Sequence, residues 1–361
     1  MIRWLRILLL SLAVAGAVAA GLWAYAGDRI VLALAGRIAA ANLAADRAAS
    51  LPDGLHLAIC GAGGPMPDPA RSGPCQLVIA GDQQFLVDAG SLGARNLTRM
   101  GFRTGSITAI LLTHFHSDHI DGLGEALMLR WAGNAHTAPT PVLGPPGVAG
   151  VVDGFNAAYA LDSGYRTAHH SPAVMPPGGA GGRAETFDTP PPGEGVTVWD
   201  RDGVRITAFS VPHEPASPAV GYRFDYKGRS LVISGDTGPS PTVETFARGA
   251  DLLAHEALAP KLIAVLGDAA RAAGRDNLVK IMHDIPNYHT SPAQAAQLAA
   301  RAGVKHLVFT HVTPPLPNPL LSRLFLEGVD DAFGGPADIA RDGDLYSLPA
   351  GGEAITLEHL F

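Results

Sequence analysis

The sequence has few cysteines, few charged residues and no run of one charge. Two cysteines among 361 residues exclude a disulfide-dense scaffold and a four-thiolate metal site. Charged residues make up 16% of the chain, with 26 basic against 33 acidic side chains, and Lys and Arg are not clustered. Because binding to a nucleic-acid backbone needs clustered cations, we expect no nucleic-acid partner. Any metal ion must be held by the 14 histidines and by carboxylates.

Glycine (43) and proline (29) are abundant, but together they make up only about a fifth of the chain, below the level of a disordered composition. From Leu55 onward, strand-like runs alternate with helical patches, which predicts a layered α/β domain. The predicted helical patches include Ser117–Trp131, Pro241–Ala247 and Ser291–Ala302. Residues 169–195 are crowded with Pro and Gly, and we expect them to form a surface excursion.

The start of the chain has the pattern of an export signal. Met1–Arg6 is short and cationic, and Ile7–Ala26 holds 20 residues without a charge. A helix of that length just spans the hydrocarbon core of a bilayer, whereas a cleavable signal usually has a shorter apolar centre. A cleaved signal peptide and a retained membrane anchor therefore both stay open. In either case Arg3 and Arg6 remain inside, and the rest of the chain lies outside the cytoplasm.

The strongest chemical signal is the segment His114-Phe115-His116-Ser117-Asp118-His119. A strand-like run ends at Thr113 and a helix is expected to start near Ser117, so the segment lies at a strand-to-helix junction. His114 and His116 lie on one side of the extended chain, and the following turn brings Asp118 and His119 beside them. A zinc ion takes about four ligands, so this spacing fits two adjacent metal ions better than one.

The motif resembles the HxHxDH signature of the metallo-β-lactamase-fold hydrolases, in the branch that contains ribonuclease Z and the zinc-dependent arylsulfatases. Further segments resemble that branch's motifs in the same order along the chain: Val211–Arg223 with His213, Ser234–Thr237, Ala254–Ala257, Tyr288–Ser291 and Phe309–His311. Ile59–Pro65 and Phe85–Gly90 resemble the family's first strands. The resemblance covers about Leu55 to Leu348.

The resemblance implies an α/β fold, the four-layer αββα metallo-β-lactamase sandwich, preceded by an N-terminal signal or anchor helix. We expect residues 1–26 to form a signal peptide or membrane anchor, residues 27–54 a helical stem, and residues 55–361 the hydrolase domain. We expect that domain to be periplasmic, or anchored to the inner membrane and facing outward.

The resemblance also implies a centre of two divalent metal ions, with zinc as the expected metal. It assigns His114, His116 and His213 to the first ion, Asp118, His119 and His311 to the second, and Asp236 to both as a bridge. These ligands leave the two ions with a net positive site, so that a hydroxide bridges them and an anionic ester binds. Asp88 is expected to orient a ligand histidine, or to cap the end of its strand.

The residues expected to act in catalysis are Asp118, His255, Glu256 and His289. The resemblance implies that His255 is the general acid for the leaving oxygen and is held by Glu256. It implies that His289 stabilises charge on the transferred group.

From this site we expect an exported, metal-dependent hydrolase of small sulfuric or phosphoric esters, arylsulfatase- or phosphodiesterase-like, acting through a metal-bridging hydroxide. Asp236 disfavours β-lactam hydrolysis, because the antibiotic-cleaving members lack that carboxylate. tRNA processing is disfavoured because Tyr222 to Ser234 is a short hairpin, where some ribonuclease Z enzymes carry a long basic arm, and because tRNA maturation is cytoplasmic. A lactonase or other carboxyl-ester hydrolase is the alternative, and a ribonuclease Z-type nuclease or a non-catalytic metal-binding module ranks lower.

Cys60 and Cys75 lie at the end of one predicted strand and the start of the next. In an oxidising compartment a hairpin would bring them within bridging range, and two buried free thiols are the alternative. The apolar stretch Leu316–Leu326 follows the last expected ligand, and we expect it to pack in the core rather than at the substrate mouth or the membrane.

Overall fold

The computed structural model describes residues 2–361, which fall into two units, the first ending at Asp46 and the second running from Arg47 to Phe361. The first unit is helix α1 (Ile2–Ala44), which runs without a break past residue 26, the expected boundary between anchor and stem. Its segment Arg3–Gly21 has a mean hydropathy of 1.9 and no buried residues, so its length and composition allow it to cross a membrane.

The second unit contains two β-sheets. The first sheet has the strand order β15-β14-β1-β2-β3-β4-β5-β6 and the second has the order β13-β12-β11-β10-β9-β8-β7. The strands of the first sheet are β1 (Gly54–Gly61), β2 (Cys75–Ala80), β3 (Gln83–Val87), β4 (Ala109–Leu111), β5 (Thr140–Gly144), β6 (Gly182–Thr186), β14 (Asp344–Pro349) and β15 (Thr356–His359). The strands of the second are β7 (Gly195–Arg201), β8 (Val204–Ser210), β9 (Val220–Tyr226), β10 (Arg229–Ile233), β11 (Leu252–Leu258), β12 (His306–Thr313) and β13 (Ala337–Ile339).

The two sheets pack face to face because their central strands are apolar on both sides. In β1, Leu55, Leu57 and Ile59 join one core cluster with residues of the second sheet, whereas Ala58 and Cys60 belong to a second cluster under the helices. All eight residues of β1 are buried, as expected for a strand that is covered on both faces.

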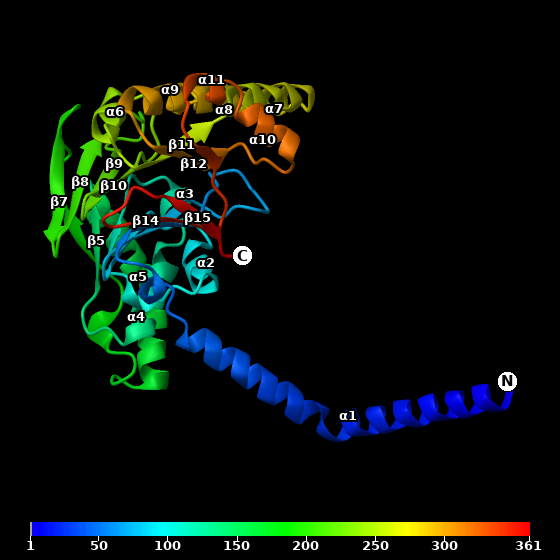
Figure 1. Cartoon of the computed structure of the whole chain (residues 1–361). Helices are drawn as coiled ribbons and strands as arrows, with labels where there is room; N and C mark the ends of the chain where they lie inside the picture. Colours follow the sequence, from blue (N-terminus) through cyan, green and yellow to red (C-terminus); the bar gives the residue numbers. More distant parts are fainter. Residues whose placement is uncertain (1) are drawn as a thin grey trace. The chain divides into compact units, whose positions relative to one another are not determined.

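Helices cover the outer face of each sheet, which gives four layers (Figure 1). The helices beside the first sheet are α2 (Gly93–Arg99), α4 (Leu123–Asn134) and α5 (Val148–His170), and the short α3 (Ser117–Ile120) precedes α4. Those on the other side are α6 (Pro241–Ala247), α7 (Pro260–Ala272), α8 (Asp276–Asp284), α9 (Pro292–Ala302), α10 (Pro319–Phe325) and α11 (Val329–Ala332). The predicted αββα sandwich is thereby confirmed.

The structure settles two local questions that the sequence left open. Cys60 and Cys75 form a disulfide that joins the antiparallel strands β1 and β2. Residues 169–195, expected as a surface excursion, contain the end of α5 and the whole of β6, which pairs with β5 at the edge of the first sheet.

Candidate metal centre

Strand directions bring the seven predicted ligands to one end of the sandwich. Strands β10, β11 and β12 are parallel, and β8 has the same direction as β10 because each is antiparallel to β9. His213 follows β8, Asp236 follows β10, and His311 lies near the end of β12. The segment 114–119 follows β4 of the facing sheet. The two sheets thus contribute ligands from opposite sides of one site.

The first group of predicted ligands comprises His114, His116, His213 and Asp236, whose ligand atoms all lie within 4.8 Å of one another. His116 Nδ1 is 2.9 Å from His114 Nε2 and 3.3 Å from His213 Nε2. Asp236 Oδ2 lies 3.9 Å and 3.8 Å from the same two nitrogens. Three imidazoles and one carboxylate oxygen therefore converge on a single point.

The second group comprises Asp118, His119 and His311, also within 4.8 Å of one another. Asp118 Oδ2 is 3.2 Å from His311 Nε2 and 3.6 Å from His119 Nε2. Asp236 Oδ2 is 3.1 Å and 3.3 Å from those nitrogens, so the same oxygen that approaches the first group also approaches the second. Asp236 lies between the two groups, where a carboxylate shared by two ions has to lie.

The donors at this centre fit divalent metal ions. Five imidazoles and two carboxylates converge in a mostly buried space, and His119 Nε2 and Asp236 Oδ1 are buried without a hydrogen-bond partner among the described residues. Buried polar atoms without a partner are costly, and a metal ion satisfies such nitrogen and oxygen donors directly. The fold and the donor set make this a divalent-metal centre.

The electrostatics favour the metal-binding forms of three of the ligands, His114, His213 and Asp236. Burial lowers the pKa of His213 and, helped by His119, brings the pKa of His114 well below its usual value. Burial alone would raise the pKa of Asp236, but His311 and His119 hold it well below the usual range. Neutral imidazoles and an ionised carboxylate are the forms that bind a metal ion. Burial would lower the pKa of His119, but Asp236 and Asp88 raise it well above its usual value.

Hydrogen-bond partners outside the ligand set fix the orientation of the ligand histidine rings. Asp88 Oδ2 is 2.8 Å from His119 Nδ1, and the same carboxylate accepts hydrogen bonds from the backbone N–H and the hydroxyl of Thr113. The expected contact of Asp88 with a ligand histidine is therefore formed. His213 Nδ1 lies 3.0 Å from the carbonyl oxygen of Tyr288. Partners of this kind set which nitrogen of each ring faces the centre.

A buried carboxylate–imidazole pair lies beside the centre. Glu256 Oε1 is 3.3 Å from His289 Nδ1 and accepts a hydrogen bond from the backbone N–H of Thr290. Burial would lower the pKa of His289, but Glu256 raises it to about 9. His289, His311 and Asp236 also place one ligand atom each within 4.8 Å of one another, so His289 faces the predicted ligands.

The expected pairing of His255 with the carboxylate of Glu256 is not formed. His255 is fully buried, and its Nδ1 lies 2.6 Å from the backbone carbonyl of Glu256, whose carboxylate contacts His289 instead. The reason is that consecutive residues of a strand point to opposite faces, so β11 cannot direct both side chains to the same centre.

The sequence interpretation also missed two threonines. Thr113 holds Asp88 as described above, and the hydroxyl of Thr290 donates to the carbonyl of Thr237, which follows the bridging aspartate. Each threonine directly precedes or follows a motif histidine, and that adjacency is the signal that could have identified it.

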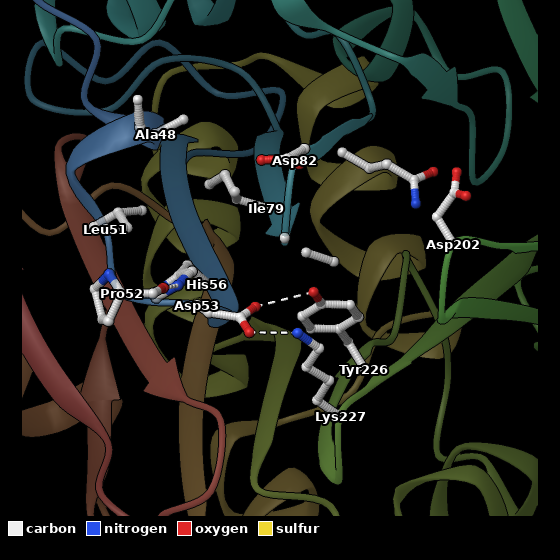
Figure 2. Close-up of a pocket in the computed structure, with 14 residues that line it drawn as sticks. Ala48, Leu51, Pro52, Asp53, His56, Ile79, Asp82, Asp202, Tyr226 and Lys227 are labelled. Atoms are coloured by element: carbon white, nitrogen blue, oxygen red, sulfur yellow. Dashed lines mark hydrogen bonds and ion pairs between the residues drawn. The ribbon is translucent and has the colours of Figure 1, made fainter.

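A cavity of about 480 Å³ lies at the opposite end of the sandwich and is not part of this centre. It is lined by the β2–β3, β7–β8 and β9–β10 turns and by the segment before β1. Figure 2 shows Asp53 in this cavity, accepting hydrogen bonds from Tyr226 and Lys227. The predicted ligands follow the other ends of β8 and β10, so the cavity lies away from them.

Comparisons with known proteins place the chain among related sequences and folds. The family described as "Beta-lactamase superfamily domain" matches residues 83–312. Ribonuclease Z of Mycobacterium marinum is 39% identical over 269 residues, which are 73% of this chain and 88% of the relative. Ribonuclease Z of Mycobacterium avium is 39% identical over 264 residues, covering 73% and 87%.

Solved structures agree on the fold. The metallo-β-lactamase fold protein YhfI of Bacillus subtilis has a TM-score of 0.57 at 18% identity, covering 82% of this chain and all of that one. The short form of human tRNase Z has a TM-score of 0.56 at 22% identity, covering 81% and 99%.

These relatives overturn the predicted activity. The expectation of an exported, arylsulfatase-like hydrolase of small esters is wrong, because relatives at 39% identity over most of the chain are ribonuclease Z proteins. For the same reason the descriptions arylsulfatase-like, signal peptide and periplasm are withdrawn. The site geometry does not distinguish the two activities, because both attack a tetrahedral anionic ester.

Proposed function

The chain belongs to the β-lactamase superfamily, in the branch that contains ribonuclease Z, and we propose that it is a phosphodiesterase that cleaves RNA in the manner of that enzyme. Family membership makes it a metal-dependent hydrolase. The observation that carries the RNA substrate is the 39% identity to ribonuclease Z over 73% of the chain. The converging ligands and the Glu256–His289 pair supply the chemistry that such a reaction needs.

This proposal replaces the expectation that no nucleic acid binds. That expectation rested on the absence of Lys and Arg runs in the sequence. Distance along the chain is a poor guide to distance in space, and Arg71, Arg99 and Arg341 come from three separate segments to line one groove. Such a groove satisfies the need for clustered cations without any cationic run.

His114, His116 and His213 would hold one divalent ion, which we propose to be zinc, Asp118, His119 and His311 would hold a second, and Asp236 would contribute to both. Divalent ions in such a pair lower the pKa of water and neutralise charge on the phosphate under attack. The ring contacts of Asp88 and Tyr288 keep the ligand nitrogens directed at the centre.

The protein's own groups move the protons. Asp118, whose side chain is 14% exposed, is held by His311 at the edge of the centre, where it can orient the attacking water and accept its proton. The water oxygen bonds to phosphorus as the bond from phosphorus to the leaving oxygen breaks. His289, held by Glu256, donates a proton to that leaving oxygen. This assignment gives to His289 the role that the sequence had suggested for His255.

The test is cleavage of a 3′-extended tRNA transcript by the full-length protein in detergent, compared with bis(p-nitrophenyl) phosphate. We expect the zinc-loaded protein to cleave the transcript at a defined position, and a chelator to abolish cleavage of both substrates. An intact transcript in the presence of metal-loaded protein that hydrolyses the small diester would contradict the proposal.

We also propose that α1 anchors the protein to a membrane. Support comes from the apolar segment Arg3–Gly21, whose length and composition allow it to cross a bilayer. Fractionation of cells tests this. Recovery of the protein in the membrane fraction is the expected result, and recovery in the soluble fraction would contradict it.

A further inference from the structure

A groove of about 730 Å³ lies in the second unit of the fold, and none of the predicted metal ligands lines it. Its walls are the loop Asp68–Ser72, helix α2, the segment Leu316–Ser322 and residues near the end of the chain, including Arg341 and Phe361. Figure 1 shows α2 and the C-terminus in the same region of the fold. Residues far apart in sequence thus form one surface.

The loop between β1 and β2 connects this groove to the centre. A Cβ atom on Gly64 would lie 3.0 Å from ring carbon Cε1 of His311, and one on Gly73 would lie 3.1 Å from the carbonyl oxygen of Asp118. Both ends of the loop therefore touch predicted ligands, while its middle, Asp68–Ser72, lines the groove. The same loop therefore borders both the groove and the predicted metal centre.

The cations of the groove differ in how far the protein already neutralises them. Arg71 is engaged, with Nη1 3.4 Å from Asp68 and Nε donating to the carbonyl of Ala340. Arg341 is exposed, and among the described residues its side chain has no hydrogen bond or ion pair. Arg99 is also exposed and donates only to the neutral amide oxygen of Asn96. Two positive charges are therefore free for a ligand.

The two acidic residues that line the groove, Asp68 and Asp342, do not neutralise these two arginines, because Asp68 pairs with Arg71. The carboxylate of Asp342 accepts hydrogen bonds from the backbone N–H groups of Ala62 and Ser72 and from the amide of Asn96, so it is turned into the protein. The Arg99 guanidinium lies 4.0 Å from the ring centroid of Phe361. Aromatic rings and arginine planes are the surfaces on which unpaired bases stack.

We propose that this arginine groove, with Arg99, Arg341 and Phe361 as its contact residues, holds the single-stranded part of the RNA next to the bond that is cleaved. The inference rests on the proposed function and adds where the RNA lies. The two arginines contact backbone phosphates, which fixes the position of the strand without selecting a sequence. The β9–β10 turn consists of Lys227 and Gly228 and is too short to form an arm that binds RNA. The arginine groove provides the RNA contacts instead.

The double variant R99Q/R341Q of the full-length protein tests the proposal. The control is R183Q/R205Q, which also removes two exposed arginines, from β6 and β8, although these two are ion-paired in the wild type. We expect R99Q/R341Q to raise KM for the RNA roughly tenfold and to lower the slope of log affinity against log salt by about 1.4. Hydrolysis of bis(p-nitrophenyl) phosphate should be unchanged, which shows that the variant is folded and its centre intact.

Binding of a labelled oligoribonucleotide, measured by fluorescence anisotropy, separates this inference from the proposed function. If wild-type protein binds the oligoribonucleotide through the groove but does not cleave RNA, the proposed nuclease activity is contradicted and the proposed RNA-binding role of the groove is kept. The same KM, affinity and salt slope in R99Q/R341Q as in R183Q/R205Q would overturn the groove while leaving the nuclease in place.

Discussion

Asp236 is the predicted ligand whose carboxylate lies close to both groups of ligands at the centre. Its Oδ2 lies between 3.1 and 3.9 Å from ligand nitrogens of four histidines drawn from both sheets. Gly235, which precedes it, has a φ of 62° and lies against Thr113, which follows β4 of the facing sheet, so the backbone approaches closely there. Replacing this carboxylate removes a ligand from both predicted ions at once.

The first prediction is that Asp236→Asn lowers metal content from two ions per chain to one or fewer. The amide keeps the size of the side chain but not its charge, so RNA cleavage should fall by at least about 100-fold. Elemental analysis of the purified protein and a cleavage assay measure both effects. Asp200→Asn, an exposed carboxylate on β7, is the control, and equal metal content in the two variants would contradict the assignment.

The second prediction separates His289 from His255. His289→Asn should lower kcat by about 10²- to 10⁴-fold, the usual contribution of a general acid, while two metal ions remain bound. His255→Gln should lower the melting temperature but leave kcat within a few-fold, because this ring is fully buried against the backbone carbonyl of Glu256 and belongs to neither group of predicted ligands. Metal loss in His289→Asn would show that His289 is a ligand rather than a proton donor.

At this scale the motifs predicted which residues meet, and one rule was overlooked. The seven predicted ligands come together, and Asp88 reaches a ligand ring as expected. The predicted pairing of His255 with the carboxylate of Glu256 is wrong, because membership of one motif does not mean that two side chains point in the same direction. Alternation along a strand, applied to two consecutive residues, would have indicated the contrary.

Among elements, the loop between β1 and β2 depends on two constraints. The Cys60–Cys75 disulfide closes its base, and Asp342 holds both of its ends through Ala62 and Ser72. Because this loop touches His311 and Asp118 and lines the arginine groove, its order matters for both the centre and the groove.

The third prediction concerns the disulfide. Replacing both cysteines by serine should lower the free energy of unfolding by about 3 kcal/mol, the expected effect of opening a loop of 15 residues. Urea unfolding followed by circular dichroism measures this. Metal content should stay at two ions, and an unchanged unfolding midpoint would show that the loop is held by other contacts alone.

The fourth prediction concerns Asp342. Asp342→Asn replaces charge-assisted hydrogen bonds to two backbone N–H groups by weaker ones, so amide hydrogen exchange at Ala62 and Ser72 should become at least about tenfold faster. Exchange in β11 serves as the internal control. Equal protection in both proteins would mean that Asp342 does not hold the loop.

Helix α5 shows why some elements cannot be predicted from the sequence. Only Val148 and Val152 of its 23 residues are buried, so it lacks the apolar stripe that marks a packed helix. The central strands, in contrast, are buried on both faces and appear in the sequence as short apolar runs. Elements with a strong burial pattern were predictable, and a largely exposed helix was not.

For the molecule as a whole, composition proved a weaker guide than motif order. The αββα fold followed from segments spread over about 290 residues, roughly a domain length, that resemble one family. The exclusion of nucleic acid followed from the lack of cationic runs, and the ribonuclease Z relatives overturn it. Folding brings isolated arginines together in one groove, which the sequence does not show. The positions of the charged side chains in the folded protein have to be known before a nucleic acid is excluded as a partner.

The fifth prediction is that the metal ions stabilise the fold by linking its two sheets. Ions that bind the folded state alone stabilise it by about 4 kcal/mol when the free metal exceeds its dissociation constant a thousandfold. Removal of metal by a chelator should therefore lower the melting temperature by several degrees, and added zinc should restore it. An identical melting temperature with and without metal would contradict a centre that joins the sheets.

The most direct measurement of the central claim is a titration of metal-free protein with zinc while cleavage of a 3′-extended RNA is followed. Two ions sharing Asp236 predict that the cleavage rate stays low with the first equivalent, rises with the second and then levels off. Bound zinc at two equivalents without any cleavage of RNA, or full activity at one equivalent, would contradict the account.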